Sequence, residues 1–551
     1  MNPVLLASLA FLIPVLPLLV ACGLPFARTQ GLALKLAAWV PVTGLLLLPL
    51  HGNVIEFPWL LLGARVGLDD TTLPFLLLAS VVWTVAGLHA RHYLHDDRQH
   101  LFFLFWLLTW TGNLCVFITL DMASFYAAYA MMTFAAYGLI VFNGQRADYH
   151  AGRVYLVMAI LGEALILAAL LTLGSQLGNL SLEANQPGVE QLRGAPWVMW
   201  CLIAGFGIKT GLIGLHMWLP LAHPRAPVPA SAILSGVILK AGLVGLLRFL
   251  PLEHSGFELA GMVLVVAGMV TAFFGVLLGL TQVRAKSLLA YSSVSQMGLI
   301  TVAIGLALIK PDTAPFLIAV VGIFALHHGL AKAMLFLAVD IAQHTPGMAR
   351  TLMWWPALAL AGAPATSGAL AKAALKSGAS AGPTGLETAL LLSSVATTLL
   401  MARFLWLTWP RNSQEADAPD GHLPWMFGVV AVMTLPWILA SITEPESTLR
   451  PFRPDYLVDT SLPVLVGMVA AILGGRFMIH RRYPAIPEGD LLFLIPRFSL
   501  PKLPKVSMGI PEGIQRTAST SLNAIDRHLI RLTPALLIGI GLLTILFSLL
   551  R

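Results

Sequence analysis

Apolar runs of about 20 residues recur along the whole chain, from the first near 4–24 to the last near 532–550. A run of that length crosses a hydrocarbon layer about 30 Å thick as an α-helix. These runs lack the alternating polar positions of a barrel strand, so helices are the expected spanning form. We therefore predict an all-α polytopic membrane protein with about 14–16 transmembrane helices.

The predicted spans are joined by short polar connections, apart from one longer polar loop at 175–196. Before that loop, apolar runs lie at 4–24, 32–50, 72–92, 101–119, 123–143 and 152–174. After it, they lie at 197–215, 229–250, 258–280, 287–309, 314–339, 352–376, 385–408, 424–442, 460–479 and 532–550. The short connections indicate a tight helical bundle, and the spans from 197 to 339 contain nearly all of the unusual ionisable residues.

The region from 481 to 531 differs from the spans because it is rich in Pro, Lys and Arg. The stretches 513–517 and 522–530 have an amphipathic pattern. A segment of this kind typically lies along the membrane surface. We therefore expect residues 481–551 to form an interfacial amphipathic segment and a final anchor helix, which pack against partner subunits or lipid headgroups rather than perform chemistry.

Composition also places the chain in a membrane. Of its 551 residues, 58% are hydrophobic and 11% are charged, whereas about 25% of the residues of a soluble domain are charged. The formal net charge is +7, but Lys and Arg lie mostly in short connections, where they act as topology signals and contact lipid headgroups. The charge therefore does not predict nucleic-acid binding.

The cysteines Cys22, Cys115 and Cys201 are far apart and show no CxxC motif and no metal-ligand spacing with His. The sequence predicts no disulfide framework, metal site or iron–sulfur cluster, and it holds no P-loop, dinucleotide or haem motif. We expect no cofactor and no catalytic residue here, so the energy for any pumping must come from a partner or an ion gradient. The N-terminus lacks a basic stretch, which indicates a retained first helix.

Ionisable side chains stand inside several apolar runs. Lys209 lies in the run 197–215, and Lys240 lies in the next one. A charge at the centre of a membrane costs about 2.5–3.5 kcal/mol by insertion scales, so two such lysines in consecutive spans require a compensating role. Because neighbouring charges can switch the protonation of a buried lysine, we predict that this role is to relay protons.

Two parts of the chain show a similar order of features. Gly162-Glu163 precedes Gly207-Ile-Lys209 in the first part. In the second part, His328 and Lys332 precede Ser367-Gly-Ala-Leu-Ala-Lys372. Charged residues in apolar spans of both halves, with Gly and Pro interruptions nearby, indicate the inverted repeats of secondary transporters.

Three longer stretches carry a resemblance to a known family. They are 209–243, which contains Lys-Thr-Gly-Leu-Ile-Gly-Leu-His-Met-Trp-Leu-Pro, then 286–298 and 328–337. They resemble the antiporter-like membrane subunits of respiratory complex I (NADH:quinone oxidoreductase), of the Mrp cation/proton antiporters and of the group 4 membrane-bound hydrogenases. The resemblance covers about residues 70–410.

The resemblance implies two inverted five-helix repeats, each with a broken helix, around a central hydrophilic axis of lysines, histidines and acids. We expect N-terminal transmembrane helices at 1–119, the first antiporter-like repeat at 120–250, the second at 251–410 and C-terminal transmembrane helices at 411–480, before the segment 481–551.

The resemblance also implies roles by position. Lys209 would be the lysine of the first broken helix, and Lys372 would be the terminal basic residue of the second. Lys240, His328 and Lys332 would form the central relay between them. A histidine suits this position because its ordinary pKa of about 6.5 allows proton exchange near neutral pH.

One departure from the family concerns the first half. The family usually has a Glu in the fifth helix as the partner of the first lysine, but the corresponding stretch 125–137 contains no acid and has Ala130 in its place. Glu163, in the next span, is then the expected partner of Lys209. If Glu163 does not reach it, the first half is a modified or impaired channel.

Each candidate also has a structural interpretation. Lysines near the end of a span often snorkel to the headgroups, and this alternative applies most to Lys286 and Lys376. Glu163 can equally be a structural acid satisfied by its neighbours. We expect helix-end roles for Asp121 and Asp340, and interfacial positions for His216, His223 and His327.

Three functions remain open. The first is a proton-translocating subunit of a redox-driven complex, bound to lipid, to other membrane subunits and to peripheral redox subunits. The second is a subunit of an Mrp-type antiporter, in which Na⁺ moves as well as protons. The third is an energy-coupling partner that uses proton flow to drive a peripheral enzyme, such as one for inorganic-carbon capture. The expected location is a bacterial inner membrane.

Overall fold

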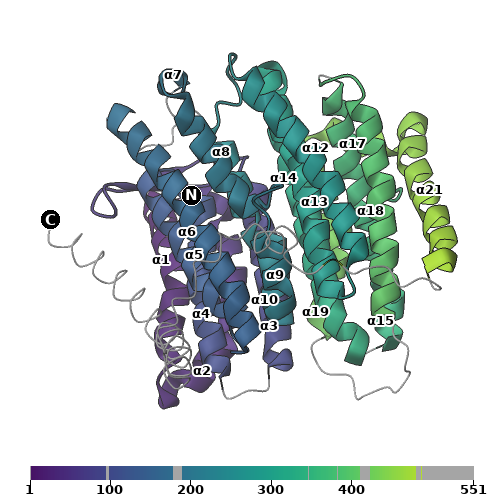
Figure 1. Ribbon diagram of the computed structural model, residues 1–551. Coiled ribbons are helices and arrows are strands. Elements are labelled where there is room, and N and C mark those ends of the chain that lie inside the picture. The colour runs from purple at the N-terminus through teal and green to yellow at the C-terminus, as the bar shows by residue number, and fades with distance from the viewer. Residues whose placement is uncertain are drawn as a thin grey trace, which may run out of the picture.

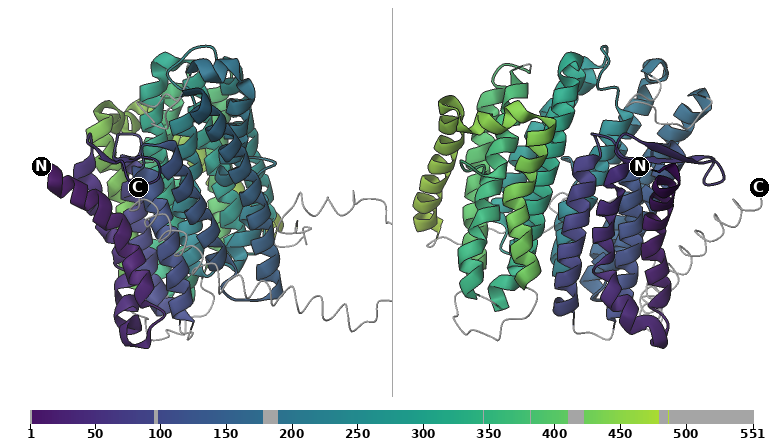
Figure 2. Two further views of the ribbon diagram at one scale, coloured as in Figure 1. Left: turned by 90° about the vertical axis from the view of Figure 1, so that its left-hand side faces the viewer. Right: turned by 180° about the vertical axis from the view of Figure 1, so that it is seen from behind.

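Helices make up most of the structure, a computed structural model that describes residues 2–94, 98–177, 189–344, 346–380, 382–409, 422–478 and 486. They stand side by side in one bundle (Figures 1 and 2). In the described part of the chain, 12 helices are long and apolar enough to cross a membrane, or up to 13 if the bent pair α2 (Ala27–Ala37) and η1 (Val40–Leu50) is one span. The chain is therefore an integral multi-pass membrane protein, as the apolar runs predicted.

The helices before the long polar loop match the first six predicted spans. Besides α2 and η1, they are α1 (Pro3–Gly23), α3 (Leu73–Tyr93), α4 (Gln99–Ile118), α5 (Met122–Ile140) and α6 (Arg146–Leu177).

The next group of helices contains the three stretches that carry the family resemblance. It comprises α7 (Val189–Gly194), α8 (Pro196–Thr210), α9 (Trp218–Arg225), α10 (Val228–Ile233), the π-helix η2 (Leu234–Ile238), α11 (Lys240–Phe249), α12 (Glu258–Thr281), α13 (Ala285–Ile309), η3 (Pro311–Thr313) and α14 (Ala314–His344).

The remaining described helices complete the bundle. They are α15 (Pro346–Leu352), α16 (Trp354–Ala361), α17 (Ser367–Ala379), α18 (Leu386–Thr408), α19 (His422–Thr443), α20 (Pro445–Leu449), η4 (Arg450–Phe452) and α21 (Pro454–Met478). The predicted span 352–376 is divided between α16 and α17, and the span 197–215 contains only α8, which has 15 residues, so neither is among the 12 long ones. The predicted span 532–550 and almost all of the interfacial segment lie outside the described residues.

A short hairpin, which the all-α prediction omitted, lies before α3. Strands β1 (Val54–Phe57) and β2 (Ala64–Gly67) pair antiparallel, with Val54 opposite Gly67. Leu61, Leu62 and Gly63 turn the chain between them with positive φ angles. Strands of four residues give too short an alternation to be recognised in an apolar sequence.

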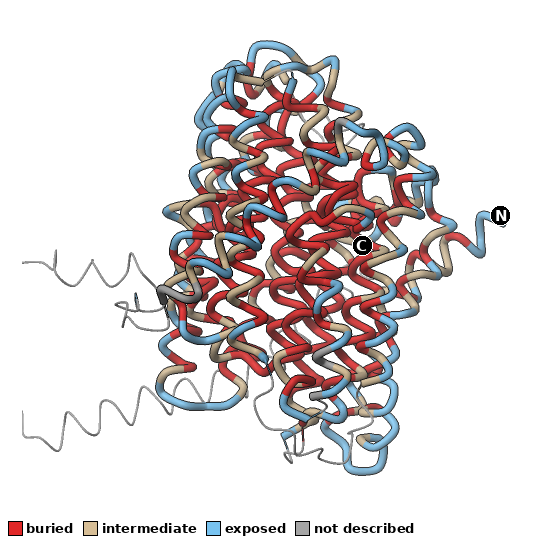
Figure 3. Tube along the Cα trace, turned by 90° about the vertical axis from the view of Figure 1, so that its right-hand side faces the viewer, coloured by how far each residue is buried: buried red, intermediate tan, exposed pale blue. Residues whose placement is uncertain are grey.

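The middle of the bundle is the most buried part, and the exposed positions lie around it (Figure 3). In the span Val228–Phe249, 100% of the apolar window is buried, against 22% in the span Tyr456–Gly474 of α21. A fully buried helix has no face toward lipid. The ionisable residues of Val228–Phe249 must therefore be satisfied by neighbouring helices.

Close helix packing in the core uses glycine. A Cβ on Gly268 of α12 would lie 2.6 Å from the carbonyl oxygen of Gly298 in α13, and one on Gly261 would lie 2.6 Å from the carbonyl oxygen of Gly305. Such distances are too short for any larger residue, so these glycines let the two backbones touch, as small residues do in membrane helix pairs. This packing fixes α13 against its outer neighbour and directs its polar residues inward.

Candidate functional site

Two helices of the bundle are broken, each at a glycine in the left-handed region. α8 ends before Gly211, where φ is 80°, and α16 ends before Gly362, where φ is 85°. Glycine adopts this conformation without the strain that a Cβ causes, so it ends a helix readily. Each break leaves the partial negative charge of a helix C-terminus inside the protein, which favours a nearby cation.

Lys209 lies in the last turn of α8, beside the first break, and is 5% exposed. Its ammonium donates a hydrogen bond of 2.8 Å to Oγ1 of Thr133 in α5. It also lies 5.3 Å from the centre of the Tyr129 ring and 5.6 Å from that of Tyr155. Aromatic faces attract cations, so uncharged groups stabilise the ammonium in its immediate surroundings.

Glu163 of α6 is 4% exposed and lines the same cavity as Lys209. The cavity has a volume of about 10 Å³ and is also lined by Tyr129, Thr133 and Tyr155. No direct ion pair joins the carboxylate of Glu163 to Lys209. The two groups face one space, which Thr133 of α5 also lines. The stretch 125–137, which lacks the acid that the family usually has there, thus supplies the Thr133 hydroxyl instead.

Lys240 begins α11 directly after the π-helix η2 and is fully buried. Its ammonium donates a hydrogen bond of 2.7 Å to the carbonyl oxygen of Ser235, within η2. π-Helical turns change the hydrogen-bond pattern of a helix and are frequent at functional sites. Here the π-turn lies against α14, because a Cβ on Gly329 would be 2.5 Å from the carbonyl oxygen of Gly236.

Hydrogen bonds lead in a line from Lys240 to Lys332 through Ser235, whose backbone carbonyl accepts from Lys240 and whose side-chain hydroxyl makes the next bond. The hydroxyls of Ser235 and Ser293 are 2.7 Å apart, and the Ser293 hydroxyl donates to the carbonyl oxygen of Leu289 over 3.1 Å. That same oxygen accepts a hydrogen bond of 2.6 Å from the ammonium of Lys332. All five residues are fully buried, so η2, α13 and α14 share a continuous polar contact inside the bundle.

His327 and His328 lie next to this line on α14. His328 is fully buried, and Lys240 and Lys332 both act on it electrostatically. Nδ1 of His327 is 2.9 Å from the hydroxyl of Ser367, the first residue of α17. His327 therefore contacts the second broken helix, although the sequence assigned the relay to His328 alone.

The interfacial positions expected for His216, His223 and His327 are wrong. All three are fully buried. The ring of His223 stacks on that of Phe336, with centroids 4.8 Å apart, and the ring of His216 lies 5.2 Å from that of Phe274. Polar residues flanking a Pro-containing segment resemble an interface in the sequence, but the break in the helix brings this segment into the core.

Lys372 lies at the second break. Its ammonium donates a hydrogen bond of 2.8 Å to the carbonyl oxygen of Ala361, the last residue of α16. Its side chain lies against Gly362, where a Cβ would be 2.8 Å from Cδ of the lysine. The lysine thus caps the C-terminal end of a helix, an arrangement that favours its positive charge.

A second cavity, with a volume of about 30 Å³, is lined by Lys372 and by an ion pair that the sequence did not reveal. Lys376 of α17 contacts the carboxylate of Asp459 in α21. Lys376, in the last turn of α17, thus has a carboxylate partner. The only sequence signal was an acid just before the apolar run 460–479, and nothing in the sequence placed that run beside α17.

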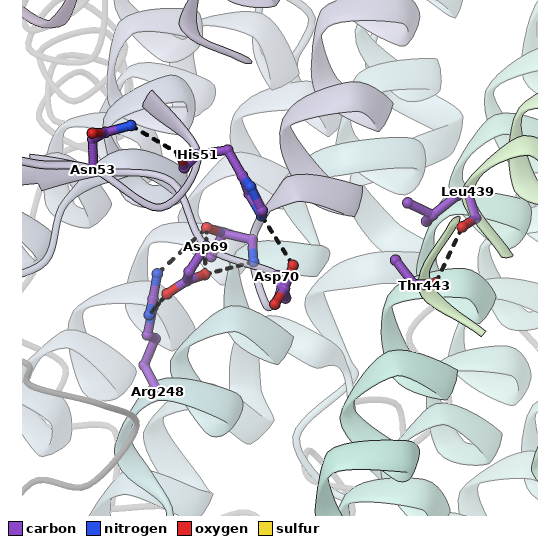
Figure 4. Close-up of polar contacts among 8 residues, drawn as sticks. His51, Asn53, Asp69, Asp70, Arg248, Leu439 and Thr443 are labelled. Carbon is purple, nitrogen blue, oxygen red and sulfur yellow. Dashed lines mark hydrogen bonds and ion pairs between the residues drawn. The ribbon is translucent and has the colours of Figure 1, made fainter. Parts of the chain in front are cut away.

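Arg248 is a buried charge on the same helix as Lys240, at the other end of α11. It is 2% exposed and forms an ion pair with Asp69, just before α3. Figure 4 shows this pair beside the contact of His51 with Asp70, whose atoms are 2.9 Å apart. The pair holds α11 to the start of α3, away from the line between Lys240 and Lys332.

The helix-end roles expected for the two aspartates agree with the structure. Asp121 caps α5 by accepting a hydrogen bond of 2.7 Å from the backbone N–H of Ser124. Asp340 lies near the end of α14 and is 3.0 Å from Nε2 of His89. Lys286 donates a hydrogen bond of 2.6 Å to the carbonyl oxygen of Ala226.

The structure thus brings the six predicted relay residues into three groups. Glu163 shares the first cavity with Lys209; Lys240, His328 and Lys332 surround the central line; Lys372 lies in the second cavity. Among the residues that the structure describes, no group of three or more His, Cys, Asp or Glu side chains is arranged to hold a metal ion.

Comparisons with known proteins show the family of the chain. The family described as "NADH:quinone oxidoreductase/Mrp antiporter, TM" matches residues 119–399, which is half of the chain. Hydrogenase-4 component B of Escherichia coli (strain K12) is 30% identical over 325 residues, 54% of this chain and 48% of that protein. An Na⁺/H⁺ antiporter subunit of Alkalihalophilus pseudofirmus is 26% identical over 419 residues, 70% of this chain and 82% of that protein.

Two solved structures share the fold. A chain of the Mrp complex from Dietzia sp. DQ12-45-1b is 20% identical with a TM-score of 0.71, over 95% of this chain and 60% of that one. A chain of the membrane-bound sulfane sulfur reductase, an archaeal respiratory membrane complex, is 20% identical with a TM-score of 0.66, over 95% of this chain and 94% of that one. Against several curated relatives, the match spans about half of their length.

Proposed function

Because the chain belongs to the NADH:quinone oxidoreductase/Mrp antiporter transmembrane family, we propose that it moves protons across a membrane as one subunit of a larger, redox-driven complex. The observation that carries this proposal is the fully buried line from Lys240 through Ser235, Ser293 and Leu289 to Lys332. Charges and hydroxyls inside a membrane bundle are costly and mark ion or proton pathways.

The proposed path begins with Glu163 and Lys209 and ends at Lys372. The cavity of about 10 Å³, close to the space that one water needs, lies between the Glu163 carboxylate and the Lys209 ammonium, which exchange a proton through it. The central group passes it on, with His328 between the two lysines. His327 then extends the path, because it contacts Ser367 at the start of the helix that carries Lys372.

The physical basis is the way in which each lysine is bound. Lys209, Lys240 and Lys332 donate to a hydroxyl or a carbonyl oxygen rather than to a carboxylate. A neutral acceptor holds the side chain in place without locking the charge, whereas a direct ion pair would favour one protonation state strongly. The charge of the next group along the line can then decide whether a lysine holds its proton.

We propose the same division of the chain that the resemblance implied. The first repeat, 120–250, contains the break at Gly211, and the second repeat, 251–410, contains the break at Gly362. The two broken helices run through the bundle in opposite directions, α8 to α9 and α16 to α17, which supports an inverted relation (Figure 1). Helices within 1–119 and 411–480 flank them.

An orientation follows from the charges at the two ends of the bundle. The connections at the end where α2 and α15 lie carry many basic residues: Arg28, Lys35, Arg91, Arg98, Arg146, Arg225, Arg284 and Lys286. Basic connections mark the cytoplasmic side. We therefore place this end in the cytoplasm of a bacterium, and the opposite end, with the β1–β2 hairpin and the C-terminus of α17, on the outer side of the inner membrane.

A second candidate function is that of a cation/proton antiporter subunit. It is favoured by the likeness to the Na⁺/H⁺ antiporter subunit, 82% of which is covered. The two functions differ in what accompanies the chain. Purification of the tagged protein from its own membrane in mild detergent, followed by mass spectrometry, should find iron–sulfur or flavin subunits for a redox-driven complex. It should find only small membrane subunits for an antiporter.

The transport role is tested in native-membrane vesicles that contain the whole complex. Proton movement is followed with a pH-sensitive dye. It is driven by the reaction of the co-purifying redox subunits, or by a Na⁺ pulse if there are none. We expect Lys332→Ala to abolish coupled transport while the complex still assembles, because the central line then lacks its proton carrier. Lys310→Ala, at an exposed position after α13, is the matched control. Transport that survives Lys332→Ala contradicts the proposal.

A further inference from the structure

The second cavity contains a carboxylate on a helix outside the three groups above. α17, α18 and α21 surround a cavity of about 30 Å³. In the described part of the chain, its titratable lining groups are Lys372, Lys376, Tyr456 and Asp459. The hydroxyl residues Ser393, Ser394 and Thr460 complete the polar lining. The rest of the lining is apolar and comes mainly from Leu299, Leu375, Leu390 and Leu391, so the titratable groups share a small, largely apolar space.

Asp459 is unusual for its position. The span Tyr456–Gly474 of α21, which contains Asp459, is largely exposed at the surface of the bundle, with 22% of its window buried. Asp459 nevertheless points inward, where its side chain is 24% exposed and that of Lys376 is 20% exposed. An acid that only marked the end of a helix would face water. This one faces a cavity and a lysine.

The charges in the cavity are unequal. Lys372 and Lys376 are four residues apart on one helix, so their side chains lie on the same face, one turn apart. Asp459 contacts Lys376, and the ammonium of Lys372 donates to the carbonyl oxygen of Ala361. With both lysines protonated, two cations share one carboxylate. Loss of a proton from Lys372 relieves that repulsion, and Asp459 is the one carboxylate among the described groups that line the cavity.

The two halves of the chain then have related designs. In the first half, Glu163 and Lys209 line a cavity beside the break at Gly211. In the second half, Asp459 and Lys372 line a cavity beside the break at Gly362. Each half has an acid that comes from a neighbouring helix and a lysine held by a neutral oxygen.

We propose that Asp459 is the carboxylate through which the second half exchanges protons with the face of the membrane where α17 ends. This inference rests on the proposed transport function. The proton that leaves the Lys372 ammonium binds the Asp459 carboxylate, which becomes a neutral acid, while Lys372 becomes a neutral amine. Asp459 then releases the proton to water at that face and pairs again with Lys376, which keeps its charge throughout.

The experiment separates this role from a clamp that only holds α21 in place. Asp459→Asn alone leaves Lys376 without its partner, so it tests both roles together. The double variant Asp459→Asn/Lys376→Met removes both charges and keeps the size of the side chains. If the pair is only a clamp, the double variant assembles and transports like the wild type, and the proposal is overturned.

If Asp459 carries the proton, the double variant assembles but transports about a hundredfold more slowly, the lower end of the range for a proton-transfer group. Asp459→Glu keeps a carboxylate and should retain most of the rate. The matched control is Glu190→Gln/Arg193→Met, which removes an exposed ion pair of 2.8 Å and should change nothing. All variants are compared in vesicles that contain the whole complex.

If the double variant does not assemble, chemical labelling of carboxyl groups in the wild-type complex tests the proposal instead. Dicyclohexylcarbodiimide modifies protonated carboxyl groups in membranes, and mass spectrometry locates the product. Modification of Asp459 in step with the loss of transport supports the proposal, whereas no modification at any pH tested, or modification without loss of transport, overturns it. Lys332→Ala in the same assay reports on the transport function separately, so failure of one proposal is distinguishable from failure of the other.

Discussion

A buried ammonium needs hydrogen-bond acceptors, and the lysines inside the bundle obtain theirs from uncharged oxygens. The lysines themselves could be predicted from the sequence, because a charge within a long apolar run is conspicuous. Their acceptors could not. Thr133 is 76 residues from Lys209, and Leu289 is 43 residues from Lys332. A serine, a threonine or a backbone carbonyl in an apolar helix gives no signal until the helices are packed.

Thr133 offers a test at this scale. Thr133→Val keeps the shape of the side chain and removes the hydroxyl that Lys209 uses. We expect transport to fall several-fold and the protein to lose about 1–3 kcal/mol of stability, the usual cost of leaving a buried polar group unsatisfied. The measurements are the transport rate in vesicles and thermal unfolding of the purified complex.

Thr109→Val is the matched control, because Thr109 is also buried but donates to the carbonyl oxygen of Phe105 in its own helix, over 2.6 Å. Equal effects on transport from the two substitutions would show that Lys209 does not depend on Thr133.

At the scale of elements, local chemistry predicted some irregularities and missed others. The breaks after α8 and α16 were expected, because glycine interrupts the apolar spans near Lys209 and Lys372. The π-helix η2 was not, because Leu-Ser-Gly-Val-Ile resembles an ordinary apolar segment. Its cause lies in the packing of Gly236 against Gly329 on α14. Only tertiary contact distinguishes such a turn from a regular helix.

The second break depends on one glycine in particular. A Cβ on Gly368 would lie 1.7 Å from the carbonyl oxygen of Ala359, where α16 and α17 meet. We expect Gly368→Ala to force the two half-helices apart and to destabilise the protein by about 3 kcal/mol or more, the upper range for overpacking. Lys372 would then lose its place at the end of α16.

Thermal unfolding in detergent checks this expectation. Gly31→Ala is the control, because nothing lies within 4 Å of a Cβ at that position in α2, and alanine there should be neutral or slightly stabilising. An unchanged unfolding temperature for Gly368→Ala would mean that the two half-helices are not packed as described.

For the whole molecule, the order of the spans could be predicted, because each apolar run reports directly on its own burial in a membrane. The arrangement of the spans around the charges could not. The contact of α21 with α17 joins residues 83 positions apart. This contact places Asp459, the acid of the second cavity, beside Lys376. The family resemblance predicted the central lysines but not the two serines that link them, since hydroxyl groups are common in every span.

Those serines connect the halves of the molecule, which leads to a prediction about coupling. Ser235→Ala and Ser293→Ala each remove one hydroxyl from the line between Lys240 and Lys332. We expect each to slow transport several-fold. The double substitution should be no worse than the more severe single one, because two interruptions of the same link are not additive. Ser292→Ala removes the neighbouring buried hydroxyl, which lies outside the line, and should leave the rate unchanged. Rates that multiply in the double variant, or a Ser292→Ala effect as large as that of Ser293→Ala, would mean that the protons cross between the halves by another route.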